Sequence, residues 1–196
     1  MYYHASQTGG IQTLLPRVSN HKIPLVYFST KRENTLVYLS NAIEKYCLET
    51  GYPHSGPWKK WGSYGFTKDG VLRLEEYYPN ATKETYEGVS GYLYGVEALA
   101  DAKPLADIPF AVSSEHPVNV HSCEFIPDAY AAILAAAAQG KILLERYETL
   151  RAQKLAWIRD TIRQEYRNCA QNGDYRHFLL GKFPFLQQEA PAQPQQ

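Results

Sequence analysis

The residues with the clearest chemical potential in this chain are a histidine, two tyrosines and a serine. His4 lies within YYHAS, and Tyr27 and Ser29 lie within LVYFS, two segments whose composition is typical of strands. Tyr38 follows Tyr27 by 11 residues. A histidine can donate or accept hydrogen bonds, and a tyrosine offers an apolar ring with one polar group. We therefore expect these side chains either to pack within the domain or to form two walls of a ligand cleft.

The other residue types that could carry chemistry give weaker patterns. Cys47, Cys123 and Cys169 are far apart and form no CxxC pair, which predicts neither a disulfide framework nor a structural zinc site. His116 and His121 lack the HxH or HExxH spacing of metal ligands, so we expect no metal site. A thiol nucleophile at Cys123 is disfavoured, because a free cysteine more often behaves as a small buried hydrophobe.

A helix should position Tyr38. The segment TKRE at 30–33 has the form of a capping box, in which the threonine oxygen and the glutamate each accept a free backbone N–H. Apolar residues then recur at spacings of three and four and predict one buried stripe: Leu36, Leu39, Ile43 and Cys47. At about 100° per residue, Tyr38 falls on the opposite face beside Asn34 and Asn41. We therefore do not expect Tyr38 in the core of this helix.

A long segment at 52–90 carries many aromatic rings. They are Trp58, Trp61, Tyr64, Phe66, Tyr77, Tyr78 and Tyr86. So many rings argue against disorder, and loops of this length inside a compact domain are usually functional or mobile. We expect an irregular insertion that folds over something.

Three further strand-like segments follow the insertion, in GYLYGVE, FAVSS and VNVHSCEFI. After Asp128 the pattern becomes wholly helical, with one helix in AYAAILAAAA and a longer one over 147–171. We predict an α+β fold, with a core at 1–128 that holds a small mixed or antiparallel sheet, and a helical extension at 129–186 packed on that core. The polar, proline-bearing end at 187–196 is expected to be disordered.

The composition limits the classes of molecule that this chain is expected to bind. The chain has 196 residues, enough for a domain with a sizeable core, and its 20 Lys and Arg balance 20 Asp and Glu. A zero net charge argues against nucleic acid as the main partner. We expect neither a membrane span nor a signal peptide, and hence a cytoplasmic soluble protein. The 16 tyrosines favour a ring-lined cleft or an interface, such as a homodimer contact.

The order of YHAS and VYFSTKRENTLVY resembles the ADP-ribosyltransferase superfamily, which includes the catalytic domains of poly(ADP-ribose) polymerases and the small bacterial rifampicin ADP-ribosyltransferases. In that superfamily a strand carries His-Gly-Ser or His-Gly-Thr, a second strand reads roughly Tyr-Phe-Ser/Ala, and a tyrosine follows on a helix. GYLYGVE is similar to the following strand of the small bacterial enzymes. The resemblance covers about residues 2–40 and, more loosely, 91–128, and it implies a sheet of the ADP-ribosyltransferase-like type.

The resemblance implies that NAD is the substrate, and that ADP-ribose passes to an acceptor or NAD is hydrolysed. It assigns NAD binding to the positions of His4, Ala5, Ser6, Tyr27, Ser29 and Tyr38. His4 would hold the adenosine ribose and the amide side of NAD, and Ser29 would support the ribose. Tyr38 would stack on the nicotinamide ring and act in catalysis. Ala5 departs from the superfamily's glycine and adds a methyl group where backbone should approach the ligand closely.

Catalysis of this kind also needs a carboxylate that stabilises the developing cation as nicotinamide leaves. Glu124, in VHSCEFIPD, is the first candidate. The rival acids are Asp101, Asp107 and Glu115. Two functions therefore stay open, an NAD-dependent ADP-ribosyltransferase with an unknown acceptor and a non-catalytic nucleotide- or protein-binding module on the same fold.

Each of these residues also has a purely structural interpretation. His4 could be a half-buried strand histidine whose ring bonds to a backbone carbonyl, and Tyr38 could pack under the insertion. Glu124 could pair with a lysine or cap a nearby helix. The nucleotide hypothesis requires that the ring of His4 and the ring of Tyr38 border one open slot.

Overall fold

The main sheet of this α+β fold contains seven strands within residues 1–18, 23–54 and 58–189, the parts of the chain that the structure, a computed structural model, describes. Their order is β11–β7–β1–β4–β9–β8, and β3 also pairs with β4. The strands are β1 Tyr2–Ser6, β3 Arg17–Val18, β4 Pro24–Ser29, β7 Gly91–Val96, β8 Lys103–Pro104, β9 Ala111–Ser114 and β11 Ser122–Ile126. Their pairings are antiparallel. The predicted α+β class is thus confirmed.

The strands β1 and β4 separate in the middle of this sheet. β1 pairs with β7 along its whole length, but it pairs with β4 only at Tyr3↔Ser29. Next to that position the ring of His4 bonds to the carbonyl oxygen of Tyr27. In a continuous antiparallel ladder a backbone N–H would satisfy that oxygen. The side chain thus replaces a ladder bond where the two strands part.

The segment that was expected to be an irregular insertion has regular structure. It contains β5 (Tyr64–Phe66), β6 (Leu72–Glu75) and α2 (Ala81–Tyr86). β6 pairs with β5 on one side and, in parallel, with β12 (Ile142–Glu145) on the other. The prediction of an irregular segment was wrong, because these strands are too short to show a clear alternation. The prediction of a wholly helical C-terminal part was wrong at β12, since a short apolar run reads equally as helix or strand.

Two helical pieces replace the single helix predicted after residue 30. The first, η1, is a 3₁₀-helix at Arg32–Tyr38, and the second, α1, spans Ala42–Glu49. The capping box does not form, because the Thr30 hydroxyl donates to the Phe110 carbonyl oxygen instead, at 3.4 Å. The break between the pieces does not disturb the predicted stripe. All four of its members are fully buried: Leu36, Leu39, Ile43 and Cys47.

Five further helical segments follow Asp128. They are α3 Ala129–Ala138, η2 Tyr147–Thr149, α4 Ala152–Asn168, α5 Gly173–Lys182 and α6 Phe185–Glu189. The Asp128 carboxylate caps α3 by accepting the Ala131 N–H at 2.8 Å, as its position before an apolar run favours. The helix predicted over 147–171 is shorter at both ends. Residues 187–189 belong to α6, which corrects the expected disorder there, and 190–196 lie outside the described residues.

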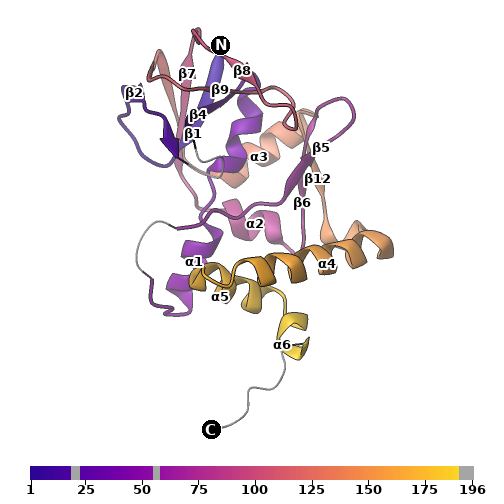
Figure 1. The fold of residues 1–196 in the computed structure, drawn as a ribbon. Helices are drawn as coiled ribbons and strands as arrows, with labels where there is room; N and C mark the ends of the chain where they lie inside the picture. The colour runs from indigo at the N-terminus through magenta and orange to yellow at the C-terminus, as the bar shows by residue number, and fades with distance from the viewer. Residues whose placement is uncertain (19–22, 55–57, 190–196) are drawn as a thin grey trace.

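Three apolar clusters hold the elements together. One joins η1, β7 and α3 around Leu36, Leu93 and Ile133, and it covers one face of the main sheet. Another joins α1, α4 and α5 and includes Ile162. The third, around Phe28, covers the other face of the main sheet, beside the small sheet of β2 (Thr13–Leu14) and β10 (Val118–Asn119). Figure 1 shows the main sheet at the top of the view and α4–α6 at the bottom.

Within the described parts of the chain, no helix is both long and apolar enough to cross a bilayer.

Candidate functional site

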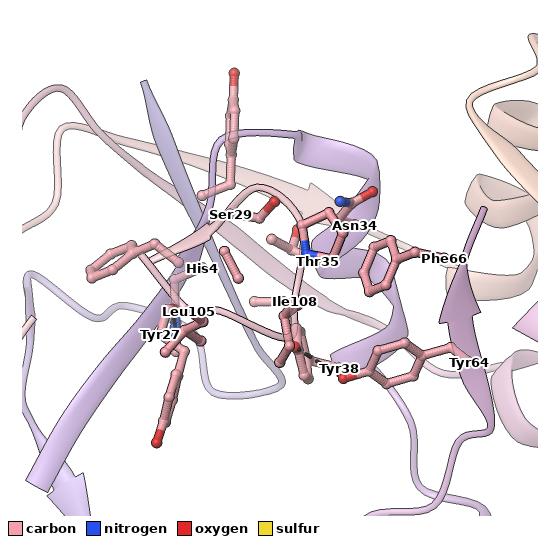
Figure 2. Close-up of a pocket in the computed structure, with 15 residues that line it drawn as sticks. His4, Tyr27, Ser29, Asn34, Thr35, Tyr38, Tyr64, Phe66, Leu105 and Ile108 are labelled. Atoms are coloured by element: carbon pink, nitrogen blue, oxygen red, sulfur yellow. Dashed lines mark hydrogen bonds between the residues drawn. The ribbon is translucent and has the colours of Figure 1, made fainter. Parts of the chain in front are cut away.

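A cavity of about 280 Å³ lies where β1 and β4 part. Its walls come from β1, β4, η1, β5 and the segment that leads from β8 to β9 (Figure 2). Most of the lining is aromatic or aliphatic. The lining residues are Tyr3, His4, Ala5, Tyr27, Phe28, Ser29, Asn34, Thr35, Tyr38, Tyr64, Phe66, Leu105, Ile108, Pro109 and Ala111. His4 and Tyr38 therefore line the same cavity, as the nucleotide hypothesis requires.

Five of the six positions predicted to bind NAD line this cavity. They are His4, Ala5, Tyr27, Ser29 and Tyr38. The sixth, Ser6, is the last residue of β1 and does not line it; its hydroxyl accepts the Thr8 N–H at 3.1 Å. The middle of β1 thus lines the cavity, whereas its last residue, Ser6, stabilises the turn that follows the strand.

His4 enters the lining as a neutral imidazole. Its Nδ1 lies 2.8 Å from the Tyr27 carbonyl oxygen, which can only accept, so Nδ1 carries the proton. Burial of the ring lowers the pKa of His4, and this outweighs the opposite effect of the Tyr27 carbonyl. Nε2 is therefore a hydrogen-bond acceptor at neutral pH. The expected bond to a backbone carbonyl exists, and it fixes the tautomer of the His4 ring.

Tyr38 stands at the end of η1 opposite the first strand. Its ring meets the ring of Tyr64 edge-on, with centroids 6.3 Å apart and an interplanar angle of 80°. The two hydroxyl oxygens are 3.3 Å apart, and Figure 2 shows them facing each other. Although the side chain is 44% exposed, desolvation of its hydroxyl and the neighbouring Tyr64 raise the pKa of Tyr38 far above its usual range. Tyr38 thus presents an uncharged aromatic wall.

Three small polar side chains complete the lining. The Ser29 hydroxyl oxygen accepts the Lys31 N–H at 3.1 Å, which leaves its proton available. The Thr35 hydroxyl donates to the Arg32 carbonyl oxygen at 2.7 Å, which leaves its oxygen available as an acceptor. Asn34 is buried, and neither atom of its amide has a hydrogen-bond partner among the described residues. The described residues of the lining therefore offer donors and acceptors but no formal charge.

Glu124 does not line the cavity. Its carboxylate holds the Arg32 guanidinium by two contacts, Nε–Oε2 at 2.8 Å and Nη2–Oε1 at 2.5 Å. In the sheet Glu124 is in register with Leu93 of β7, which is in register with Ala5 of β1. Glu124 thus shares a sheet face with Ala5, two strands away, or about 10 Å at the usual strand spacing. Glu124 pairs with an arginine of η1, where the sequence suggested a lysine or a helix cap.

The three rival acids also lie outside the cavity lining. Asp101 accepts hydrogen bonds from the Ser114 hydroxyl at 2.6 Å and the Glu115 N–H at 2.8 Å, and it contacts His116 Nδ1 at 3.0 Å. These bonds hold the pKa of Asp101 well below its usual range. Glu115 pairs with Lys103 at 2.5 Å, and Asp107 is exposed on the segment between β8 and β9. Asp101 and Glu115 are thus engaged in organising the end of β9.

The aromatic insertion contributes two rings to the cavity and uses others for packing. Tyr64 and Phe66, both on β5, form the wall beside Tyr38. Trp61 and Tyr78 pack into the cluster with α4 and α5. The expectation that the insertion folds over something therefore holds for β5, which lies against η1 because β6 anchors it.

Several lining residues were not predicted from the sequence. Thr35 lies three residues before Tyr38, so the spacing on a helical turn could have identified it. Three more come from the segment between β8 and β9, namely Leu105, Ile108 and Pro109. No local pattern marks that segment, which reaches the cavity through backbone bonds such as the Thr30 N–H to the Phe110 carbonyl oxygen at 2.9 Å.

No group of three or more metal-ligating side chains gathers anywhere in the described ranges. Comparison of the chain with protein-family models, with curated proteins and with solved structures finds no match.

Proposed function

We propose that this chain is an ADP-ribosyltransferase-like domain whose cavity takes the nicotinamide end of NAD. The observation that carries the proposal is that His4, on the first strand, lines one cavity of about 280 Å³ together with Ser29 and Tyr38, which lie more than 20 residues later in the sequence. That volume is near the lower end of ligand sites, about 300 Å³. It suits one flat ring with its substituent, so the adenosine half of NAD would lie outside it.

The lining suits a flat heterocycle such as the pyridinium ring of NAD. Tyr38 offers an uncharged and partly exposed ring on which a flat ring can stack. The neutral His4 supplies an acceptor for a sugar hydroxyl, and Ser29 supplies a donor. The pyridinium ring of NAD carries a delocalised positive charge, which the face of an aromatic ring such as that of Tyr38 attracts.

The second candidate function is a nucleotide-binding module without catalysis. It is favoured by the lining, in which the described residues include no aspartate or glutamate. Cleavage of the bond between nicotinamide and ribose develops a positive charge on the ribose, and a nearby carboxylate is the usual means of stabilising it. Glu124 would have to leave Arg32 to serve in that role, because both of its oxygens contact the guanidinium.

Titration of the purified chain with NAD, followed by calorimetry and by thermal shift, tests binding. We expect saturable binding that nicotinamide competes for, and a loss of at least about tenfold in affinity for Tyr38→Ala. Trp157→Ala is a matched control, because Trp157 is a similarly exposed ring on α4, outside the lining. No binding at millimolar NAD would refute the proposal.

Release of nicotinamide from bound NAD then separates the two candidates. Turnover that disappears in Glu124→Gln would assign catalysis to this chain. Binding without turnover, in the presence or absence of nucleophilic acceptors such as arginine or serine peptides, would assign the non-catalytic module.

A further inference from the structure

Phe110 has an unusual backbone conformation beside the cavity. Its φ is +64°, in the left-handed region, where Asn80 is the only other non-glycine residue among those that the structure describes. Asparagine tolerates that region, whereas a bulky aromatic residue rarely enters it. Phe110 lies on the segment between β8 and β9, and both of its neighbours, Pro109 and Ala111, line the cavity. Strain of this kind persists only where surrounding contacts compensate it, commonly at ligand sites.

The turn that contains Phe110 would suit a glycine better. The Ala111 N–H bonds to the Ile108 carbonyl oxygen at 3.1 Å, which closes a turn with Pro109 in its second position and Phe110 in its third. Proline favours the second position of such a turn, and a positive φ in the third position usually selects glycine. Phenylalanine therefore stands where its backbone is poorly suited, and the contacts of its ring account for its presence.

The ring of Phe110 packs against the turn between β5 and β6. A β-carbon placed on Gly70 in that turn would lie 2.7 Å from Cε2 of the ring and 3.5 Å from Cβ of Pro109. The absence of a side chain on Gly70 thus permits the close approach. On the other side, Lys31 Nζ lies 3.8 Å from the ring centroid, and the Phe110 carbonyl oxygen accepts the Thr30 N–H at 2.9 Å. These contacts hold the ring in place despite the strain.

Packing, and not a backbone ladder, joins two walls of the cavity at this contact. One wall is β5, with Tyr64 and Phe66, which belongs to the three-stranded sheet. The other wall, at 105–109, leads into β9 of the main sheet, and Figure 2 shows Leu105 across the cavity from Tyr64 and Phe66. Within the described residues, no backbone hydrogen bond joins the two walls. They can therefore part without the loss of any strand pairing.

We propose that the Phe110 ring and the Gly70 backbone form a clasp that opens when NAD enters or leaves the cavity. This inference rests on the proposed function. It makes Phe110 a positioning residue, because Phe110 does not itself line the cavity. The closed clasp holds the segment at 105–109 toward β5, so that both walls meet the flat ring of the ligand. The cavity is small for a ligand site, so a ring that carries its ribose enters more readily when the walls separate.

A clasp acts on the rates of binding more than on the affinity. Loss of the Phe110 ring lowers the barrier to separation of the walls, so the ligand enters and leaves faster. The residues that line the cavity stay the same, so the dissociation constant changes little. A purely structural ring would have the opposite signature, because its loss would lower the unfolding temperature and leave both rate constants unchanged.

The first experiment measures both rate constants by stopped-flow fluorescence with the etheno-adenine analogue of NAD, whose fluorescent base would lie outside the cavity. We expect Phe110→Gly, which removes the ring and relieves the strain, to raise the association and dissociation rate constants about threefold or more. Phe110→Tyr keeps the ring and should keep the wild-type rates. Phe125→Ala is the matched control, because Phe125 is also an exposed ring outside the lining. Wild-type rates in Phe110→Gly would overturn the inference.

The second experiment locks the clasp with a reversible crosslink. The 3.5 Å between a β-carbon at position 70 and Cβ of Pro109 falls within the range of disulfides, about 3.5–4.5 Å. We expect the double variant Gly70→Cys/Pro109→Cys to form a disulfide, and its oxidised form to bind the analogue at least about tenfold more slowly than its reduced form. The wild type, whose Cys123 is exposed, receives the same oxidation as the control. Equal rates in the oxidised and reduced forms would overturn the inference.

The outcomes separate this inference from the proposed function. If the analogue does not bind to the wild type, the proposed function fails and the clasp fails with it. If it binds, but neither loss of the ring nor the crosslink changes its rates, only the clasp is overturned. If neither variant folds, the wild type decides: an observed rate that levels off as the ligand concentration rises supports an opening step, and a rate that stays linear to millimolar ligand overturns it.

Discussion

The Nδ1–H of His4 on β1 donates a hydrogen bond to the Tyr27 carbonyl oxygen on β4 at 2.8 Å. A side chain thereby occupies the place of a backbone donor at the point where the two strands stop pairing. The bond fixes the tautomer of His4 and gives the Tyr27 carbonyl oxygen a hydrogen-bond donor. One interaction therefore serves both the fold and the site.

The state of His4 predicts a pH dependence of stability. Burial lowers its pKa from 6.5, so between the folded pKa and 6.5 the unfolded chain binds more protons than the folded one, and stability rises with pH. The contribution of His4 is complete above about pH 6.5 and is lost as pH falls through the folded pKa. We expect the unfolding temperature of the wild type to fall more steeply below pH 6.5 than that of His4→Asn. His121→Asn, an exposed control, should keep the steeper slope; equal slopes in wild type and His4→Asn would contradict the assignment.

Tyr64 supports Tyr38 mainly through its ring. The two hydroxyl oxygens are 3.3 Å apart, a long contact for O–H···O, whereas the rings meet edge-on. We expect Tyr64→Phe to keep NAD affinity within about twofold and Tyr64→Ala to lower it several-fold, because Tyr38 loses its neighbour. Calorimetric titration measures both. An equal loss in the two variants would show instead that the hydroxyl pair positions Tyr38.

The pair of Arg32 and Glu124 should add little to stability. Glu124 is 51% exposed and Arg32 is 30% exposed, and exposed pairs contribute about 0–1 kcal/mol. We expect Glu124→Gln to lower the free energy of unfolding in urea by no more than about 1 kcal/mol. NAD affinity should change less than about twofold, since Glu124 does not line the cavity. A large loss of affinity would mean that bound NAD extends to Arg32 and Glu124.

A buried glutamate outside the cavity should contribute far more to stability than the Arg32–Glu124 pair does. The Glu76 side chain is 2% exposed; its carboxylate accepts bonds from Arg146 Nη1 at 2.9 Å and from the Tyr147 and Thr82 N–H groups at 3.2 Å. Removal of Arg146 would leave this charge buried without its cation, a change that costs about 3–5 kcal/mol. We expect a loss of about that size for Arg146→Met in urea unfolding. Glu148→Gln, at an exposed neighbour, should leave stability unchanged; a small effect of Arg146→Met would show that the two N–H groups suffice.

The sequence predicted the part of the site that local patterns encode. His4, Tyr27, Ser29 and Tyr38 lie on or beside segments with clear strand or helix signals, and the structure brings all four to one cavity. The turn from η1 to α1 was missed, because the buried stripe continues at helical spacing through the break at Leu39. Periodicity reports which side chains are buried, and it does not report whether the backbone between them stays helical.

The remaining walls depend on contacts between distant segments. The sequence identified Tyr64 only as one of many rings in the insertion. The pairing of its strand, β5, with β6 is what places Tyr64 beside η1. Leu105 and Ile108 lie in a segment with no periodicity, and long-range backbone bonds bring them to the cavity. The four acids could be identified as candidates from the sequence, but their partners could not, because ion pairs such as Arg32–Glu124 form only in the folded chain.

The parallel pairing of β12 with β6 has a consequence for the order of events during synthesis. β5 carries Tyr64 and Phe66 and is held by β6, whose outer edge is completed by a strand that begins at Ile142. When the ribosome has delivered the histidine, the serine and both tyrosines of the first 40 positions, the strand that anchors their facing wall has not yet been translated. The cavity can therefore be completed only late in synthesis of the nascent polypeptide. A transcript truncated before codon 142 would yield a product that contains the binding residues but lacks the strand that supports the facing wall of the cavity.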